Sequence, residues 1–177
     1  MAIIVNFFGP PGAGKSTGAA YVFSLLKMNG VNCELVTEYA KDAVWEKNAT
    51  VLKNQVKILG EQYLRLTRCE NEVDVIVTDS PLLNSSFYNR KEDISEPFNA
   101  LVLTLFNQSQ NINYYIRRVR PYVQEGRTQT EAESDRVAVQ IKEMLDKEKI
   151  PYEEYPGDIK SYEKIAREII DIVKNKA

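Results

Sequence analysis

The sequence predicts an α/β fold with a five-stranded, mostly parallel sheet and helices on both faces. Strand-like and helix-like segments alternate along the 177 residues, which is the pattern of parallel strands joined by helices. The first strand-like segment, Ile3–Phe8, is apolar on both faces, as is typical of a strand buried inside such a sheet. A glycine-rich turn joins it to the first helix.

The elements follow one another in a simple order. Strands are expected at Ile3–Phe8, 32–37, 73–78, 113–117 and 152–155, and helices at Lys15–Met28, 40–47, 51–69, 95–106, 130–147 and 162–173. Ligands of such folds bind outside the carboxyl ends of the strands. We therefore expect the chemistry in the residues that follow each strand.

Local signals set several helix boundaries. The first helix, Lys15–Met28, stops at Asn29-Gly30, a common C-terminal signal. Apolar residues three and four positions apart over 51–69 predict one face of a long helix. Ser95 is the expected N-cap of a later helix, and Thr130-Glu131-Ala132-Glu133 is a capping box that opens another.

The turn after the first strand is the most specific motif of the chain. Residues 9–17 read G-P-P-G-A-G-K-S-T, the P-loop pattern G-x-x-x-x-G-K-[ST] between a strand and a helix. Its glycines let the backbone bring N–H groups close to phosphate oxygens, and the helix directs its positive dipole end to the same place. The sequence therefore predicts a P-loop NTPase fold that binds a nucleoside triphosphate, which we take to be ATP.

Each residue of the P-loop has an expected role. Lys15 can reach the β- and γ-phosphates, and the Ser16 hydroxyl can ligate Mg²⁺. The expected nucleotide-binding residues are Gly9, Gly12, Ala13, Gly14, Lys15, Ser16 and Thr17.

Composition excludes several classes of protein. The net charge of −2 and the pI of about 5.4 are not typical of a protein that holds duplex DNA with its whole surface. The absence of histidine excludes Ser-His-Asp and Cys-His catalysis and histidine-ligated zinc, so a general base must be Asp or Glu, or less easily Lys or Tyr.

The two cysteines, Cys33 and Cys69, are far apart in the sequence, and we expect both to be reduced. With no transmembrane run, we expect a cytoplasmic protein without a membrane partner, formed as one domain over 1–177.

Carboxylates follow the second and third predicted strands. Asp79 ends an apolar-leaning strand after the P-loop, which is the Walker B arrangement, and it is the expected Mg²⁺ ligand with Ser16. Glu38 ends the second strand on the acceptor side and is the candidate general base. Asp42, four residues further on the same helical face, and the ring of Tyr39 are candidate contacts to the acceptor.

A basic, turn-forming stretch begins at Arg117. Phosphoryl transfer needs cations on the transferring group, and a closing lid can supply them. We expect such a lid at about 119–135, with Arg127 in a catalytic role and Arg120 and Arg136 on the phosphates.

With these residues in place, the chain resembles a set of small P-loop kinases that includes the ribosylnicotinamide kinase domain of the bacterial NAD-synthesis regulator and phage-encoded members. The likeness spans nearly the full chain in the same order, over the P-loop, 38–42, 78–79, 97–101, 121–127, 135–136 and 149–152. Val77, Lys41 and Ser80-Pro81 depart from that pattern on the acceptor side, so they bear on the substrate more than on the reaction. Glu38 also stands where nucleoside and deoxynucleoside kinases place a carboxylate base, after the second strand.

The expected function is ATP- and Mg²⁺-dependent transfer of the γ-phosphoryl to a hydroxyl of a nucleoside, a nucleotide or a related compound. One alternative is a phage-type kinase for 5-hydroxymethyluridine in DNA, which the basic stretch favours and the acidic charge disfavours. Another is an ATPase without an acceptor, although Ser80 follows Asp79 where ATPase motors place a glutamate. A GTPase lacks its N-K-x-D motif here, and a P-loop binding module without turnover is a further alternative. The acceptor and the oligomeric state stay open.

Overall fold

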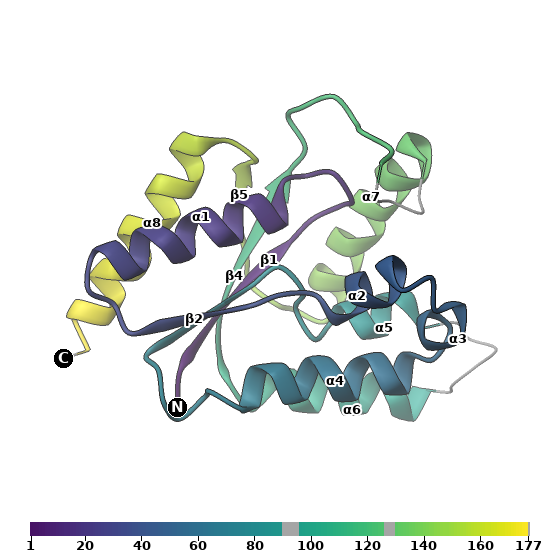
Figure 1. Cartoon of the computed structure of the whole chain (residues 1–177), viewed down its shortest axis with the longest axis horizontal. Helices are drawn as coiled ribbons and strands as arrows, with labels where there is room; N and C mark the ends of the chain where they lie inside the picture. The colour runs from purple at the N-terminus through teal and green to yellow at the C-terminus, as the bar shows by residue number, and fades with distance from the viewer. Residues whose placement is uncertain (90–95, 126–129, 177) are drawn as a thin grey trace.

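The computed structural model describes residues 1–89, 96–125 and 130–176, and its centre is a parallel five-stranded sheet (Figure 1). The strands are β1 (Ile3–Phe8), β2 (Cys33–Val36), β3 (Val75–Thr78), β4 (Gln110–Arg117) and β5 (Glu153–Pro156). Their order across the sheet is β2-β3-β1-β4-β5, and each neighbouring pair is parallel. The predicted fold class is confirmed, and the P-loop strand β1 is central, as its apolar character indicated.

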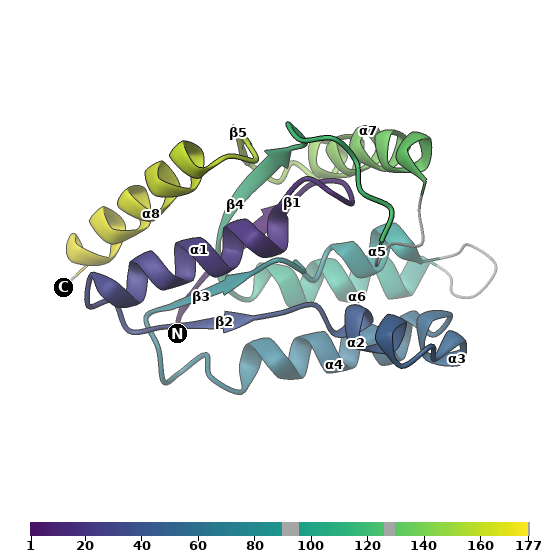
Figure 2. The same ribbon diagram turned by 45° about the horizontal axis from the view of Figure 1, so that its top comes forward.

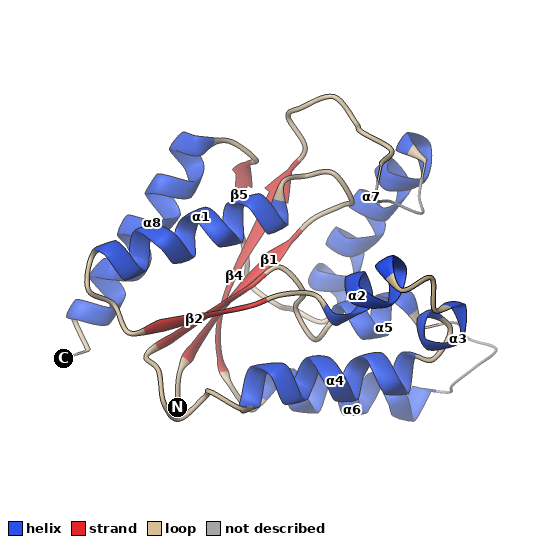
Figure 3. Ribbon diagram, in the orientation of Figure 1, coloured by secondary structure: helices blue, strands red, loops and turns tan. Residues whose placement is uncertain are grey.

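Helices cover both faces of this sheet (Figure 3). They are α1 (Lys15–Met28), α2 (Tyr39–Trp45), α3 (Ala49–Leu52), α4 (Gln55–Thr67), α5 (Asn84–Tyr88), α6 (Glu96–Asn107), α7 (Glu131–Lys147) and α8 (Ile159–Lys174). Helices α1 and α8 lie side by side on one face, and α4, α6 and α7 pack on the other (Figure 2). Within the described residues, none of these helices has the length and hydrophobicity needed to cross a bilayer.

The side chains of β1 build two separate cores. Ile3, Val5 and Phe7 pack against α1 and α8, whereas Ile4 and Phe8 pack against α4, α6 and α7. This alternation is the two-residue period of a strand, and here both faces are apolar because both are covered by helices. β1 is therefore held by the hydrophobic effect from both sides.

The predicted long helix over 51–69 is wrong in one respect, because the structure divides it. α3 ends at Leu52, and α4 begins after Asn54, whose side chain accepts the Lys57 N–H as an N-cap. The apolar spacing continues through the break, so periodicity alone does not reveal it. The short helix α5 was not predicted, while the capping box of Thr130 and Glu133 at the start of α7 is confirmed. Ser95 lies outside the described residues.

A buried amide cluster links β1 to β4. The Asn6 side chain donates to Asn111 Oδ1 at 2.8 Å and to Asn113 Oδ1 at 3.0 Å, and Asn113 donates in turn to the Pro151 carbonyl. Asn6 and Asn113 are directly opposite each other in the parallel ladder. Because buried polar groups are costly without partners, this cluster favours one register of the two strands.

We expect Asn6→Ala to lower the free energy of unfolding by about 2–3 kcal/mol, because it leaves two amide oxygens in β4 without their donor. Urea denaturation measures this. Asn175→Ala at the exposed end of α8 is the control, with a change within about 0.5 kcal/mol. Equal effects of the two substitutions would contradict a register role for the cluster.

Candidate functional site

The carboxyl ends of β1, β3 and β2 meet at one edge of the sheet, and each is followed by a predicted functional residue. The P-loop follows β1, Asp79 follows β3 and Glu38 lies just after β2. The register pairs Thr78 with both Asn6 and Val36, so these three strands advance together toward that edge. The topology thus brings together residues that are far apart in the sequence.

Only glycine fits the strained positions of the P-loop backbone. Gly9 has a φ of 139° and Gly14 a φ of 94°, values that residues with a Cβ rarely adopt. A Cβ on Gly9 would lie 2.4 Å from the Ile116 carbonyl oxygen, and one on Gly14 would lie 2.7 Å from the Tyr162 hydroxyl. The loop therefore packs against β4 and α8 on one side and turns its other side to the strand ends.

The amino end of α1 faces into this loop. Gly14 is its N-cap and supplies no side-chain hydrogen bond, so no side chain caps the N–H groups of the first turn. These groups are directed at the loop over residues 9–14, which is called the cradle below. Ser16 and Thr17 are exposed there, whereas Ala13 is buried. Backbone N–H groups, a helix dipole and exposed hydroxyls are the donor set that suits the phosphates of a nucleotide.

Lys15 lies across the loop. Its Nζ donates to the carbonyl oxygens of Gly9 at 2.8 Å and Pro10 at 3.1 Å. These contacts hold a positive charge beside the cradle, where phosphate oxygens compete well for an ammonium group. The position predicted for Lys15 is consistent with this geometry.

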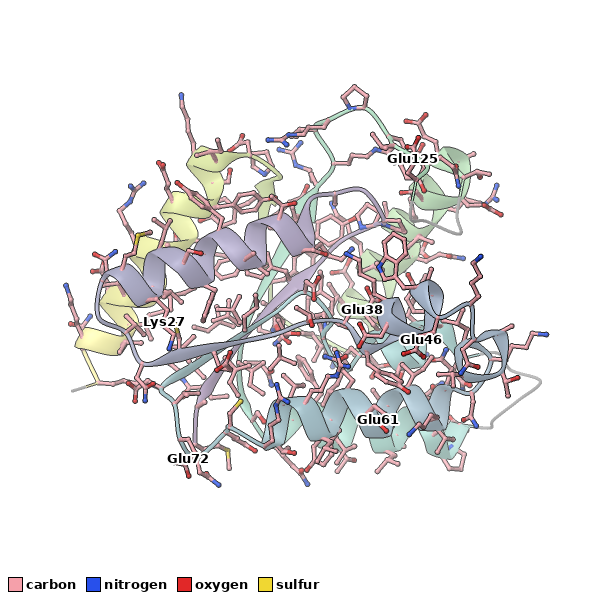
Figure 4. The ribbon with its side chains drawn as sticks, in the orientation of Figure 1. Lys27, Glu38, Glu46, Glu61, Glu72 and Glu125 are labelled. Atoms are coloured by element: carbon pink, nitrogen blue, oxygen red, sulfur yellow. The ribbon has the colours of Figure 1, made fainter. Side chains whose placement is uncertain are left out.

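Asp79 and Glu38 are joined through the backbone. Asp79 is only 4% exposed, and its Oδ1 accepts the Glu38 N–H at 3.1 Å. This bond fixes the Asp79 carboxylate at the end of β3 and sets the start of α2 next to it. Figure 4 shows Glu38 at that end of α2. Asp79 and the exposed Ser16 hydroxyl are hard oxygen ligands of the kind that Mg²⁺ prefers.

Glu38 is in a mixed electrostatic environment. Burial raises the pKa of its carboxyl group, and the Asp79 carboxylate adds to the rise. The Lys15 ammonium opposes both effects, so these three groups lie within electrostatic reach of one another. A carboxylate whose pKa is shifted toward neutrality is better suited to accept a proton than an ordinary surface glutamate.

Tyr39 and Asp42 are held together by Arg65 of α4, which the sequence did not indicate. The Arg65 guanidinium pairs with Asp42 at 2.5 Å and lies 5.1 Å from the centre of the Tyr39 ring. The Tyr39 N–H donates to Gln62, a buried polar residue in the apolar face of α4. In the sequence, the contact between Tyr39 and α4 is indicated only by Gln62, a polar residue between Leu59 and Leu66 on an otherwise apolar face.

Helix α5 adds an aromatic side chain on the Glu38 side. Burial raises the pKa of Tyr88 to about 12, and the nearby Glu38 carboxylate contributes to that shift. The Tyr88 ring meets Phe87 edge-on, with centroids 4.8 Å apart. Tyr88 and Tyr39 are therefore two aromatic side chains on the Glu38 side of the site.

The predicted lid arginines are distributed over three segments. Arg120 and Arg136 are exposed, and Arg127 lies outside the described residues. Burial raises the pKa of the Tyr162 phenol to about 12, and the positive charge of Arg120 opposes that rise. Arg118, which no sequence pattern distinguishes from its neighbours, donates to Ser134 Oγ at 3.1 Å and pairs with Asp135. Arg118 thus ties the end of β4 to α7.

Comparisons with known proteins agree with this geometry. A family model described as AAA domain matches residues 4–162, which include the P-loop, Glu38, Asp79 and α7. The chain belongs to this AAA domain family. It is accordingly a P-loop NTPase domain.

More distant relatives share parts of the chain or only its fold. The RecA proteins of Anaplasma marginale and Ehrlichia chaffeensis are 34% and 33% identical over 85 residues, which is 44% of this chain. The match spans only 24% of the length of those RecA proteins. The thymidylate kinase of Ehrlichia chaffeensis has the same fold, with a TM-score of 0.57 at 14% identity over 98% of both chains.

We expect Glu38→Gln to stabilise the fold at neutral pH. Because burial raises the folded-state pKa above the ordinary 4.5, the folded protein holds this proton more tightly than the unfolded chain. Wild-type stability therefore falls as the pH rises through the folded-state pKa, and the gain from glutamine disappears below 4.5. Urea denaturation at neutral pH and below 4.5 measures the difference.

The matched control is Glu46→Gln, at the other end of α2, where the side chain is exposed (Figure 4). It should change stability little at either pH. If Glu38→Gln has wild-type stability at neutral pH, burying the charged Glu38 carboxylate does not lower the free energy of unfolding, and the prediction is wrong.

Proposed function

We propose that the chain is a kinase that transfers the γ-phosphoryl of ATP, with Mg²⁺, to a hydroxyl of a nucleoside, a nucleotide or a related compound. The observation that carries this proposal is the pair of carboxylates at the strand ends. Asp79 and Glu38 lie side by side beside the P-loop, and their environments differ. One carboxylate suits the metal, and the second is left for the acceptor.

The proposed roles follow from the positions of the residues. The P-loop N–H groups and Lys15 hold and orient the phosphates, and Ser16 and Asp79 hold Mg²⁺, which neutralises charge that develops during transfer. The Glu38 carboxylate accepts the hydroxyl proton of the acceptor. The acceptor oxygen forms its bond to the γ-phosphorus as the bond to the ADP oxygen breaks, and ADP leaves.

The remaining predicted residues complete the proposed enzyme. Tyr39 and Asp42, with Arg65, form the acceptor side. Arg120 and Arg127, in a lid over about 119–135, and Arg136 just after it close on the phosphates, within one kinase domain spanning 1–177. Closure would exclude water from the transferring group and so favour transfer over hydrolysis.

The acceptor is to be found by experiment. The shared fold of a thymidylate kinase supports a nucleotide-like acceptor. The resemblance of the sequence motifs to the ribosylnicotinamide kinase domain supports a nucleoside. A phosphotransfer screen with labelled ATP should therefore compare nucleosides, nucleotides and DNA that contains 5-hydroxymethyluridine. A DNA acceptor would show affinity that falls steeply with salt, whereas a small acceptor would not.

A second candidate is an ATPase without an acceptor, which the AAA domain family and the partial RecA match favour. Against it stands Ser80, a buried residue at the position where a water-activating glutamate follows the Walker B aspartate. The same screen separates the two. Rapid ATP hydrolysis that no acceptor changes would support the ATPase.

We expect Lys15→Ala to lower phosphoryl transfer by about 10³-fold or more, because it removes positive charge from the transition state. The fold should stay intact, since Lys15 packs against the loop rather than in either core. Lys27→Ala, at the other end of α1 (Figure 4), is the control and should leave transfer unchanged. Near-normal activity of Lys15→Ala would refute a P-loop kinase.

We expect Glu38→Gln to lower kcat by about 10²-fold while ATP affinity stays close to wild type, because glutamine keeps the size but cannot take the proton. Steady-state kinetics with the identified acceptor measures both parameters. Glu46→Gln again serves as the control. A raised acceptor KM with unchanged kcat would make Glu38 a substrate clamp rather than a base.

A further inference from the structure

Two buried hydroxyl groups contact the P-loop from behind, on the side away from the cradle. Ser134 of α7 is fully buried and donates through Oγ to the Pro11 carbonyl at 2.8 Å. Tyr162 of α8 is 4% exposed and donates through its hydroxyl to the Gly14 carbonyl at 3.1 Å. Two helices that are distant in the sequence therefore each anchor one peptide of the loop.

The geometry of a trans peptide makes these contacts consequential. In such a peptide the C=O and the N–H point in opposite directions, and the described residues contain no cis peptide bond. A donor that holds the Pro11 carbonyl backward turns the Gly12 N–H forward. The Gly14 carbonyl also accepts the Gly18 N–H of α1 at 2.7 Å, so the helix and Tyr162 together hold it and turn the Lys15 N–H forward.

The carbonyls of Gly9 and Pro10 cannot serve this purpose. Lys15 Nζ bonds to the carbonyls of Gly9 and Pro10, and the next residue in each case is a proline without an N–H. After Gly9, the first backbone donor of the loop is therefore Gly12. The two anchored peptides are ones that do carry an N–H group for phosphate.

Both anchors are themselves held in place. The Tyr162 ring packs so closely on α1 that a Cβ at Gly18 would lie 2.3 Å from it, and it also meets Phe7. Ser134 Oγ accepts a hydrogen bond from Arg118, which is fixed in turn by Asp135. A glycine inside α1 is thus explained by the ring that it admits.

We propose that Ser134 and Tyr162 are positioning residues for phosphate binding, which orient the Gly12 and Lys15 N–H groups through the carbonyls of Pro11 and Gly14. The inference rests on the P-loop holding phosphate, as in the proposed function, and is independent of the acceptor.

The test compares Ser134→Ala and Tyr162→Phe with Tyr115→Phe as a matched control. Tyr115 is also a buried phenol that donates to a backbone carbonyl, but to that of Ala138 in α7, at 3.0 Å, and not to a carbonyl of the P-loop. Calorimetry measures the affinity of each protein for Mg²⁺-tripolyphosphate, a probe of the cradle without base or ribose. Thermal denaturation of the same samples reports the folded fraction.

We expect Ser134→Ala and Tyr162→Phe each to weaken tripolyphosphate binding about five- to tenfold, the size typical of one lost hydrogen bond. Tyr115→Phe should lower thermal stability by a similar amount and leave binding unchanged. In steady-state kinetics, Ser134→Ala and Tyr162→Phe should each raise the KM for ATP by the same factor and leave kcat unchanged.

Variants that bind tripolyphosphate as tightly as the control would overturn the inference. If Ser134→Ala does not fold, the Tyr162→Phe protein decides the outcome, since it loses a single oxygen. A wild-type protein that binds neither tripolyphosphate nor ATP would instead refute the proposed function.

Discussion

The candidate site depends on the parallel pairing of β1 between β3 and β4. This strand is covered on both faces and hydrogen-bonded along both edges, so it has no freedom to shift. Because its neighbours run in the same direction, the residues that follow β1, β3 and β2 reach one edge together. The P-loop, Asp79 and Glu38 are neighbours for this reason, and not through any local sequence relation.

The same edge of the sheet holds buried carboxylates, whose charges do not favour folding. Asp79 is buried and Glu38 lies beside it, so two carboxylates share a region in which the Lys15 ammonium, and to a smaller extent that of Lys41, opposes the burial of charge. Such an arrangement costs stability at neutral pH and is typical of functional sites rather than of cores. The hydrogen bond from the Glu38 backbone to Asp79 keeps the two carboxylates in fixed positions instead of letting them separate.

The sequence predicts the elements around the candidate site better than it predicts the long-range contacts of that site. The strand Ile3–Phe8 was predicted with its exact bounds and the helix from Lys15 to about Met28, because the apolar pattern and the glycine signals that mark them are local. The break at Asn54 was missed, since its cap is a weak local signal inside a strong apolar repeat. Arg65 and Ser134 were missed for a different reason. Their importance lies in contacts with Asp42 and Pro11, across many residues of chain, and a pattern in one segment does not show its partner.

These long-range contacts also explain why the P-loop sequence is not sufficient to make the site. The strand and helix around the loop come from the start of the chain, while Ser134 and Tyr162 come from α7 and α8 near its end. The cradle is complete only when the last helix has docked beside α1 on the sheet, since the ring of Tyr162 fills the space over Gly18. Phosphate binding and the docking of α8 therefore favour each other, because a ligand that binds only the assembled loop stabilises every contact that assembles it.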